Sequence, residues 1–319
     1  MTQRKLIITH NLNENLIESV KEVVPDWEVI IGREPSSWNH HLQSAEIIVG
    51  WKKEMSVLFD HEHKLKWLQS WSAGVNSMPL TKLKSNHVVL TSANGVHAYP
   101  ISETIFALML SLTRNIHTYV RNQLSKTWNH SGLKLELHGK TLGIIGVGAI
   151  GKETAKIAKA FGMTVLGVRN SGQSEPYVDA MYLANELNEV LPQCDYVVVT
   201  LPLTDNTRQM FGTSQFQQMK PSTIFINIGR GQIVDEAALI EALENKKIAA
   251  AGLDVFEKEP LNENSPLWEM ENVIITPHTA GSTEHYATRV IEDIFIPNLR
   301  GYLNNQIPFI NVVDFKKGY

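Results

Sequence analysis

The sequence lacks the features that mark secreted, membrane-spanning and nucleic-acid-binding proteins. A single cysteine among 319 residues excludes a disulfide framework and a four-cysteine zinc site. The 29 Lys and Arg against 33 Asp and Glu give a formal net charge of −4, whereas proteins that neutralise nucleic-acid phosphates are clearly basic. The apolar run Leu6–Thr9 is too short for a signal peptide, and no apolar stretch approaches the ~20 residues that span a bilayer. We therefore expect a cytoplasmic protein without nucleic-acid or membrane partners.

What the sequence does contain suits a folded chain of two domains. Hydrophobic residues make up 43% of it and charged residues 19%, which is enough apolar material for large cores and too much for a disordered chain. At roughly 150 residues per domain, this length corresponds to about two domains.

Short apolar runs follow one another in the N-terminal part of the chain. Several are apolar at consecutive positions, which is typical of strands that are buried on both faces in a parallel sheet. The runs are Lys5–Thr9, Trp27–Ile31, Ala45–Gly50, Leu65–Ser70 and Val88–Thr91. Between the first two runs, Asn13–Val24 has apolar residues at helical spacing and is followed by Pro25, so we predict a helix there.

A second series of apolar runs begins at Thr141 and alternates with helical patterns, which is the signature of a doubly wound sheet. The predicted strands are Leu142–Gly146, Thr164–Arg169, Tyr196–Leu201, Thr223–Ile228, Ala249–Leu253 and Val273–Thr276. The predicted helices are Ile150–Phe161, Ser214–Met219 and Asp235–Asn245. The fold class is therefore α/β, with two Rossmann-like, doubly wound parallel-sheet domains.

Two further segments have helical patterns. Ile101–Tyr119 is apolar nearly all round, so we expect one long helix, capped by Ser102 and buried between domains or subunits. Ser282–Leu303 is expected to form the last helix.

A glycine-rich turn follows the first strand of the second series. Gly146, Gly148 and Gly151 have the spacing G-x-G-x-x-G between a strand and a helix. The first glycine allows a tight turn, the second lets backbone approach a pyrophosphate, and the third lets the helix pack on the strand. The helix N-terminus adds free N–H groups and the positive end of a dipole. The turn therefore predicts a dinucleotide site.

The end of the next strand indicates which dinucleotide is preferred. Sites that prefer NAD have Asp or Glu there to bind the ribose 2′-OH, but this sequence has Arg169, Asn170 and Ser171. The guanidinium of Arg169 suits a phosphate, and Ser171 adds a hydroxyl donor. We therefore predict that NADP(H) is preferred and that NAD(H) is possible.

Four motifs in the same order resemble those of the D-isomer-specific 2-hydroxyacid dehydrogenases. The glycine turn is followed by Asn-Ile-Gly-Arg-Gly at 227–231, Gly-Leu-Asp-Val-Phe-Glu-Lys-Glu-Pro at 252–260 and Thr-Pro-His-Thr-Ala-Gly at 276–281. The resemblance implies a cleft between two domains and reversible hydride transfer between a nicotinamide and a small 2-keto acid. It implies a flavodoxin-like substrate-binding domain of residues 1–99 and 287–319, and a dinucleotide-binding Rossmann domain of residues 100–286.

Three side chains could carry out the chemistry of keto-acid reduction. Arg230 follows a predicted strand, where ligands of open α/β sheets bind, and its guanidinium can hold a carboxylate and a ketone oxygen. His278 also follows a strand and can donate and accept one proton near neutral pH. Glu259 can accept a hydrogen bond from the other ring nitrogen, which fixes the tautomer and favours the imidazolium.

The remaining site residues are expected largely from the resemblance. The loop Ser72–Asn76 resembles one whose backbone N–H groups hold the substrate carboxylate, with Ala73 and Gly74 as contacts. Asp254 resembles a carboxylate that accepts from the nicotinamide carboxamide. Further expected cofactor contacts are Gly146, Gly148, Ala149, Ile150, Arg169, Asn170, Ser171, Thr200, Leu201, Pro202, Thr207, Ile228 and Gly229.

The sequence predicts a cytoplasmic homodimeric reductase of small 2-keto acids such as glyoxylate or hydroxypyruvate. One alternative is an NAD enzyme resembling phosphoglycerate dehydrogenase, and another is a nucleotide-sensing binder resembling a corepressor. A short-chain reductase is excluded, because Tyr177 and Tyr182 are followed at the required spacing by Met181 and Glu186 instead of lysine. Two histidine pairs, at 40–41 and at 61 and 63, lack the companions of a metal site, so no metal is expected.

Overall fold

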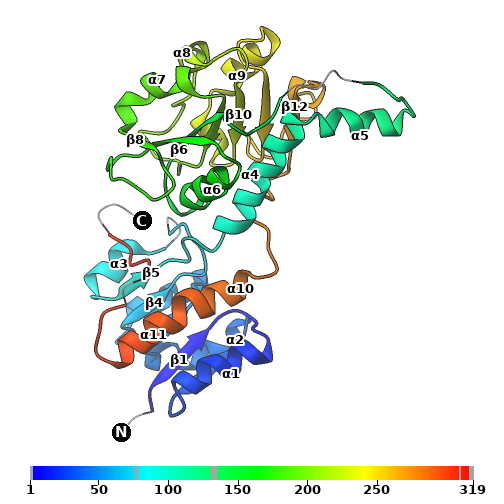
Figure 1. The fold of residues 1–319 in the computed structure, drawn as a ribbon. Coiled ribbons are helices and arrows are strands. Elements are labelled where there is room, and N and C mark those ends of the chain that lie inside the picture. Colours follow the sequence, from blue (N-terminus) through cyan, green and yellow to red (C-terminus); the bar gives the residue numbers. More distant parts are fainter. Residues whose placement is uncertain (1–2, 76–77, 131–134, 309, 316–319) are drawn as a thin grey trace. The chain divides into compact units, whose positions relative to one another are not determined.

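Two parallel sheets form the cores of the two units into which the chain divides (Figure 1). The computed structural model describes residues 3–75, 78–130, 135–308 and 310–315. One unit consists of residues 1–96 and 283–319, and the other consists of residues 97–282. Because all the strand pairs within both sheets are parallel, the predicted α/β fold with two doubly wound sheets is confirmed.

The first unit has a five-stranded sheet of order β2-β1-β3-β4-β5. Its strands are β1 (Lys5–Ile8), β2 (Glu28–Ile31), β3 (Ile47–Val49), β4 (Trp67–Gln69) and β5 (Val89–Thr91). Its α-helices are α1 (Glu14–Val23), α2 (Pro35–Trp38), α3 (Leu80–Ser85), α10 (Tyr286–Thr288) and α11 (Ile296–Leu303). Leu6 and Ile8 pack toward α1 and α11, whereas Ile7 packs toward the opposite face, which is the alternation expected of a strand between two helical layers.

The second unit has a seven-stranded sheet of order β12-β11-β10-β9-β6-β7-β8. Its strands are β6 (Thr141–Ile145), β7 (Thr164–Val168), β8 (Ala180–Tyr182), β9 (Tyr196–Val199), β10 (Ile224–Asn227), β11 (Ala250–Leu253) and β12 (Val273–Ile275). Its α-helices are α4 (Ala98–Thr113), α5 (Ile116–Leu124), α6 (Ala149–Ala160), α7 (Leu187–Val190), α8 (Thr213–Gln218) and α9 (Glu236–Glu244). Residues of α4 and α6 cover one face, and residues of α7, α8 and α9 cover the other.

Both sheets reverse their strand order at one place. In the first sheet the chain moves from β1 to β2 on one side and then to β3, β4 and β5 on the other. In the second sheet the same reversal lies between β6 and β9. The carboxyl ends of strands at such a switch point leave a crevice in which ligands of α/β proteins bind.

The prediction of a single helix over Ile101–Tyr119 is wrong. The chain breaks after α4, because Asn115 takes the left-handed conformation with φ 54°, and α5 begins at Ile116. Ser102 does not cap a helix start. It lies inside α4, fully buried, where its hydroxyl is 3.1 Å from Thr154 Oγ1 of α6. The apolar character of α4 is explained by the core of its own unit, to which Ile105 and Met109 contribute.

Two other details depart from the sequence prediction. The edge strand β8 was not predicted, because it is only three residues long. The C-terminal helical segment is not continuous α-helix, since Arg289–Phe295 forms a π-helix between α10 and α11.

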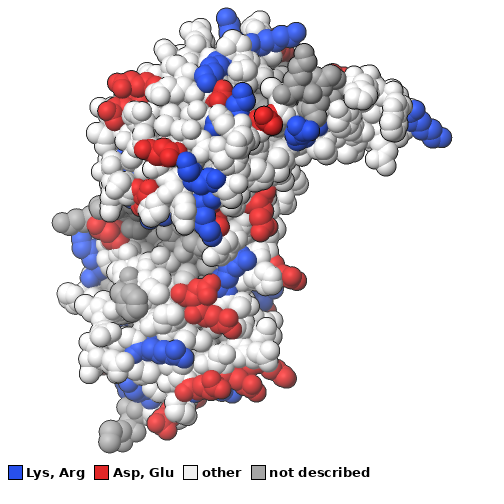
Figure 2. Space-filling view, in the orientation of Figure 1, with Lys and Arg blue, Asp and Glu red and all other residues white. Residues whose placement is uncertain are grey.

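The surface carries charges of both signs. On the face shown in Figure 2, Lys and Arg alternate with Asp and Glu over both units. Among the described residues, no helix has the length and apolarity needed to cross a bilayer.

Candidate active and cofactor sites

At two of the three glycine positions of the turn, the backbone geometry requires glycine. Gly146 ends β6 with φ 110°, and a Cβ there would lie 3.0 Å from the Leu201 backbone nitrogen. A Cβ at Gly151 would lie 2.6 Å from Gly146 O, so α6 could not pack this closely on β6. Gly148 differs, because a Cβ there would meet no described atom within 4 Å. The backbone therefore leaves open space at the N-terminus of α6.

The loop after β9 lines the other side of this switch point. The Thr200 hydroxyl donates to Gly146 O over 2.5 Å, which joins the two strand ends. Thr207 is buried, and its hydroxyl donates to Pro202 O at 2.7 Å and accepts from the Thr204 N–H at 2.8 Å. Thr207 thus shapes the loop, and its contact with a cofactor stays a prediction. A dinucleotide fits these residues, since its pyrophosphate needs close backbone and free N–H donors.

Arg169 lies directly after β7 and is already engaged by a carboxylate. Its Nη1 atom is 2.7 Å from Glu175 Oε1, and Lys152 Nζ lies 2.7 Å from the same oxygen. Hydrogen bonds from Lys152 and Arg169 hold the pKa of Glu175 below its usual value. Asn170 and Ser171 are exposed beside Arg169. Neither Lys152 nor Glu175 was predicted from the sequence, although Lys152 directly follows Gly151.

His278 and Glu259 are joined by a direct hydrogen bond. His278 Nδ1 is 2.7 Å from Glu259 Oε2, while Glu259 Oε1 accepts from the Phe256 N–H at 3.0 Å. Burial opposes ionisation of Glu259, but the bonds from His278 and Phe256 and the charge of Arg230 outweigh it. They keep the pKa of this carboxyl below its usual value. Glu259 therefore remains an anion beside the imidazole at neutral pH.

Asp254 fixes the turn that presents His278. It is buried at the end of β11, and its Oδ1 atom accepts from Thr276 Oγ1 at 2.6 Å and from the Thr279 N–H at 2.9 Å. Its Oδ2 atom accepts from the Ala280 N–H at 3.0 Å. His278 itself has φ 53°, a strained conformation for a non-glycine residue, and these bonds hold it there.

Arg230 lies on a turn that buried groups hold in place. The Asn227 side chain accepts from the Gly229 N–H at 3.1 Å and donates to Arg230 O at 3.3 Å. The Arg230 guanidinium donates to Gly229 O through Nη1, over 2.6 Å. A Cβ at Gly231 would lie 1.8 Å from the Phe256 carbonyl, so only glycine lets this turn pack against the segment that leads to Glu259.

An apolar hollow of about 430 Å³ contains the His278–Glu259 pair. Its other lining residues are Phe256, Pro260, Leu261, Trp268, Ile275 and Pro277. The walls of this hollow are mostly apolar, while the two side chains of the pair stay partly exposed to solvent.

The loop expected to bind substrate lies in the other unit. Ser72 Oγ donates to Gly74 O at 2.7 Å, and the Ala93 N–H donates to Ser72 O at 3.1 Å, which holds the loop after β4. Gly74 is exposed, and a Cβ there would meet no described atom within 4 Å. Asn76 lies outside the described residues. The structure thus brings Arg230, Glu259 and His278 into one unit and leaves Ala73 and Gly74 in the other.

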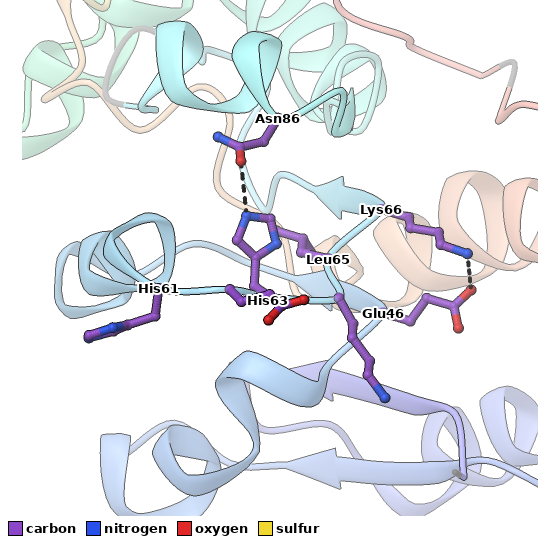
Figure 3. A pocket seen from close by; sticks show the side chains of 8 residues that line it. Glu46, His61, His63, Leu65, Lys66 and Asn86 are labelled. Atoms are coloured by element: carbon purple, nitrogen blue, oxygen red, sulfur yellow. Dashed lines mark hydrogen bonds and ion pairs between the residues drawn. The ribbon is translucent and has the colours of Figure 1, made fainter. Parts of the chain in front are cut away.

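A further hollow, of about 620 Å³, lies in the first unit around the histidines of the 61–63 segment (Figure 3). His63 Nε2 is 3.3 Å from Asn86 Oδ1, and Lys66 Nζ is 4.0 Å from Glu46 Oε1, whereas His61 points away from both. No group of three or more His, Cys, Asp or Glu that could hold a metal lies among the residues the structure describes.

Comparison with known proteins identifies the family. Residues 106–280 match the model described as "D-isomer specific 2-hydroxyacid dehydrogenase, NAD binding domain". The chain belongs to this family. The family predicted from the motifs is therefore confirmed, and by family this dehydrogenase is an NAD(P)-dependent oxidoreductase.

Two curated relatives span nearly the whole dehydrogenase chain. It is 33% identical to D-3-phosphoglycerate dehydrogenase from Methanocaldococcus jannaschii, over 98% of this chain but 61% of that protein, so it spans less than two thirds of that relative's length. It is 34% identical to glyoxylate/hydroxypyruvate reductase B from Klebsiella pneumoniae, over 95% of this chain and 96% of that protein.

Solved structures agree on the fold of this dehydrogenase. A family member from Aeromonas salmonicida is 33% identical with a TM-score of 0.81, over 98% of this chain and 100% of that chain. An NADPH-dependent glyoxylate/hydroxypyruvate reductase from Sinorhizobium meliloti, solved with NADP and sulfate, is 29% identical with a TM-score of 0.77. The match covers 99% of this chain and 100% of that one.

Proposed function

We propose that this dehydrogenase reduces a small 2-keto acid to the D-2-hydroxy acid with NADPH, and that Arg230, Glu259 and His278 carry the reaction. The observation that supports this most directly is the 2.7 Å hydrogen bond between His278 Nδ1 and Glu259 Oε2. A histidine held in this way has a fixed ring orientation and tautomer, as an acid–base catalyst needs.

The histidine is the proton donor of the reduction. Because Nδ1 donates to Glu259, Nε2 is the atom available to the substrate. The reduced nicotinamide, when bound, supplies the hydride to the keto carbon. His278 Nε2 gives its proton to the oxygen on which negative charge develops, and Glu259 stabilises the imidazolium before that transfer. In the reverse direction the neutral imidazole takes the proton back.

Arg230 anchors the keto acid. One of its guanidinium nitrogens is bound to Gly229 O, and the planar fork has further N–H groups for a carboxylate and a ketone oxygen. The backbone N–H groups of Ala73 and Gly74 are the second proposed anchor for the carboxylate. Gly74 suits this role because a Cβ there would meet no described atom within 4 Å, which leaves the backbone open to close approach.

We assign the cofactor to the switch point between β6 and β9. The pyrophosphate would be held at Gly146, Gly148, Ala149 and Ile150, where α6 begins without a side-chain cap on its N-terminal N–H groups. Arg169, Asn170 and Ser171 would bind the 2′-phosphate and give the preference for NADPH. The other proposed contacts are Thr200, Leu201, Pro202, Thr207, Ile228, Gly229 and Asp254.

We also propose that the protein is a homodimer assembled through the second unit. The helix α5 projects from that unit in Figure 1, with Leu124 82% exposed and the following Trp128 98% exposed. Large exposed apolar side chains on a projecting helix mark an interaction surface. Sedimentation should give a dimer, and a monomer at micromolar concentration would count against this assembly.

The test is the loss of reduced-nicotinamide absorbance with glyoxylate, hydroxypyruvate, pyruvate and bulkier 2-keto acids, with NADPH and NADH in parallel. We expect turnover with the smaller acids and a higher kcat/KM with NADPH. In Arg169→Asp, the ratio of kcat/KM for NADPH to that for NADH should fall by roughly tenfold or more, since a phosphate would face a carboxylate. Cofactor binding without turnover of any acid would favour a nucleotide-sensing protein instead.

A further inference from the structure

Three charged side chains meet at one oxygen atom beside the predicted cofactor site. Glu175 Oε1 accepts from Arg169 Nη1 and from Lys152 Nζ, each at 2.7 Å. The exposed fractions of the side chains are 11% for Glu175, 22% for Arg169 and 50% for Lys152. Glu175 is therefore the least exposed side chain of the cluster, and both cations bind the same oxygen atom of its carboxylate.

Lys152 lies in a helix and Arg169 is anchored beside the sheet, where its N–H donates to Tyr182 O at 3.0 Å, whereas the anion lies farther along a loop. Lys152 lies in the first turn of α6, next to Gly151, and Arg169 directly follows β7. Glu175 lies in the connection from β7 to β8, which is held by its own backbone bonds, from Gly172 N to Arg169 O at 3.2 Å and from Val178 N to Glu175 O at 3.3 Å. A loop of this kind can withdraw its carboxylate while both cations keep their places.

We propose that Glu175 is an internal anion that occupies the place of the cofactor's 2′-phosphate, and that Lys152 joins Arg169 as a ligand of that phosphate. The inference rests on the proposed binding of NADPH at this site. It assigns to Lys152 a direct part in cofactor selection, and to Glu175 the part of a competitor that the phosphate displaces.

The charges decide which cofactor can displace Glu175. A phosphate monoester carries a charge of about −1.5 to −2 at neutral pH and three acceptor oxygens, whereas the carboxylate carries one charge. The phosphate therefore competes successfully for both cations. NADH has a neutral 2′-hydroxyl at that position and leaves Glu175 where it is. Glu175 thus lowers the affinity for NADPH, because its two contacts must be broken, and has little effect on NADH.

The experiment measures binding by calorimetry with two probes that lack the nicotinamide, adenosine 2′,5′-bisphosphate and adenosine 5′-monophosphate. In Glu175→Gln, we expect the bisphosphate to bind roughly tenfold more tightly, and in Lys152→Met roughly tenfold more weakly. The monophosphate should change less than about twofold in both variants. Opposite effects on the same probe are the signature of displacement.

Lys159→Met is the matched control. Lys159 is also on α6 and also pairs with a carboxylate, Asp179, at 2.9 Å, but this pair is separate from the Glu175 cluster. Its removal should leave both affinities unchanged. An equal loss of bisphosphate affinity in Lys159→Met and Lys152→Met would show that the loss comes from the overall charge of the protein. It would overturn the role of Lys152 as a ligand of the phosphate.

The Arg169→Asp variant separates failure of this inference from failure of the proposed cofactor preference. If the unaltered protein binds both probes equally and Arg169→Asp changes neither, then the preference for NADPH is wrong. If Arg169→Asp weakens only the bisphosphate, the preference stands. In that case unchanged or weaker bisphosphate binding by Glu175→Gln, with an unchanged melting temperature, would overturn the displacement by phosphate.

Discussion

Both units have a switch point in their strand order, but different residues line the strand ends there. Between β6 and β9 the strand ends are closed by backbone, and Gly148 leaves open space before the N-terminus of α6. Between β1 and β3 the first strand is followed by His10, whose ring stacks on Trp71 with centroids 4.1 Å apart. This stack lines a hollow of about 400 Å³ that Arg33 and Lys52 also border.

The difference shows that topology creates a crevice and that the residues at the strand ends decide its chemistry. Glycines let a ligand approach the backbone closely, which suits a pyrophosphate. Aromatic rings and long cationic side chains in the first unit instead present bulk and positive charge. Gly50 of the first unit has φ 85°, but a Cβ there would lie 2.7 Å from the His10 ring, so this glycine makes room for a side chain rather than for a ligand.

The largest expected effect tests whether His278, in the second unit, supplies the proton of the reaction. His278→Ala removes the proposed proton donor, and kcat should fall by about 10³-fold, within the range of general acid–base catalysis. The dissociation constant for NADPH should stay within about twofold, because the imidazole is placed at the keto oxygen. Steady-state kinetics and calorimetry check the two values. A loss of NADPH affinity with kcat preserved would show that His278 is structural.

A second prediction compares two open glycines, one in each unit. Gly148→Val places a side chain where the pyrophosphate is proposed to lie, so the affinity for NADPH should fall by roughly tenfold or more. Gly74→Val places one in front of the proposed carboxylate loop, so KM for the keto acid should rise by a similar factor with NADPH affinity unchanged. Both variants should fold, because each Cβ faces open space among the described residues. The same kinetic defect in both variants would contradict the assignment of the cofactor contact to Gly148 and of the substrate contact to Gly74.

The smallest expected effect concerns His10 at the switch point of the first unit. Burial, followed by the charges of Lys52 and Arg33, lowers the pKa of His10 to about 4. Between pH 6.5 and pH 4 the unfolded chain therefore binds a proton that the folded chain does not, and stability falls as the pH falls. After a discount for solvent screening, the loss from pH 7 to pH 5 is about 1 kcal/mol.

His10→Phe keeps a ring against Trp71 and removes this titration. The drop in melting temperature between pH 7 and pH 5 should shrink by about 3 °C relative to the unaltered protein. Scanning calorimetry at the two pH values measures it. An identical pH dependence in both proteins would show that His10 titrates normally.

Much of the fold could be predicted because its signals are local. Runs such as Lys5–Thr9 and Tyr196–Leu201 are apolar without alternation, which strands buried on both faces require. The break before Ile116 could not be predicted, because the pattern of Ile101–Tyr119 continues across Asn115 and only the backbone conformation of Asn115 shows where the helix ends. The edge strand β8 was missed because its apolar run is too short to distinguish from a loop.

The sequence by itself determined the family, the parallel α/β class and the types of residue that follow the strands, among them Arg230 and His278. These depend on spacing along the chain and on the rule that ligands bind at the carboxyl ends of parallel strands. Only the tertiary structure decided that Asp254 holds the His278 turn and that Glu175 stands between Lys152 and Arg169. Such contacts join side chains from separate elements, and packing rather than local periodicity sets the distance between them.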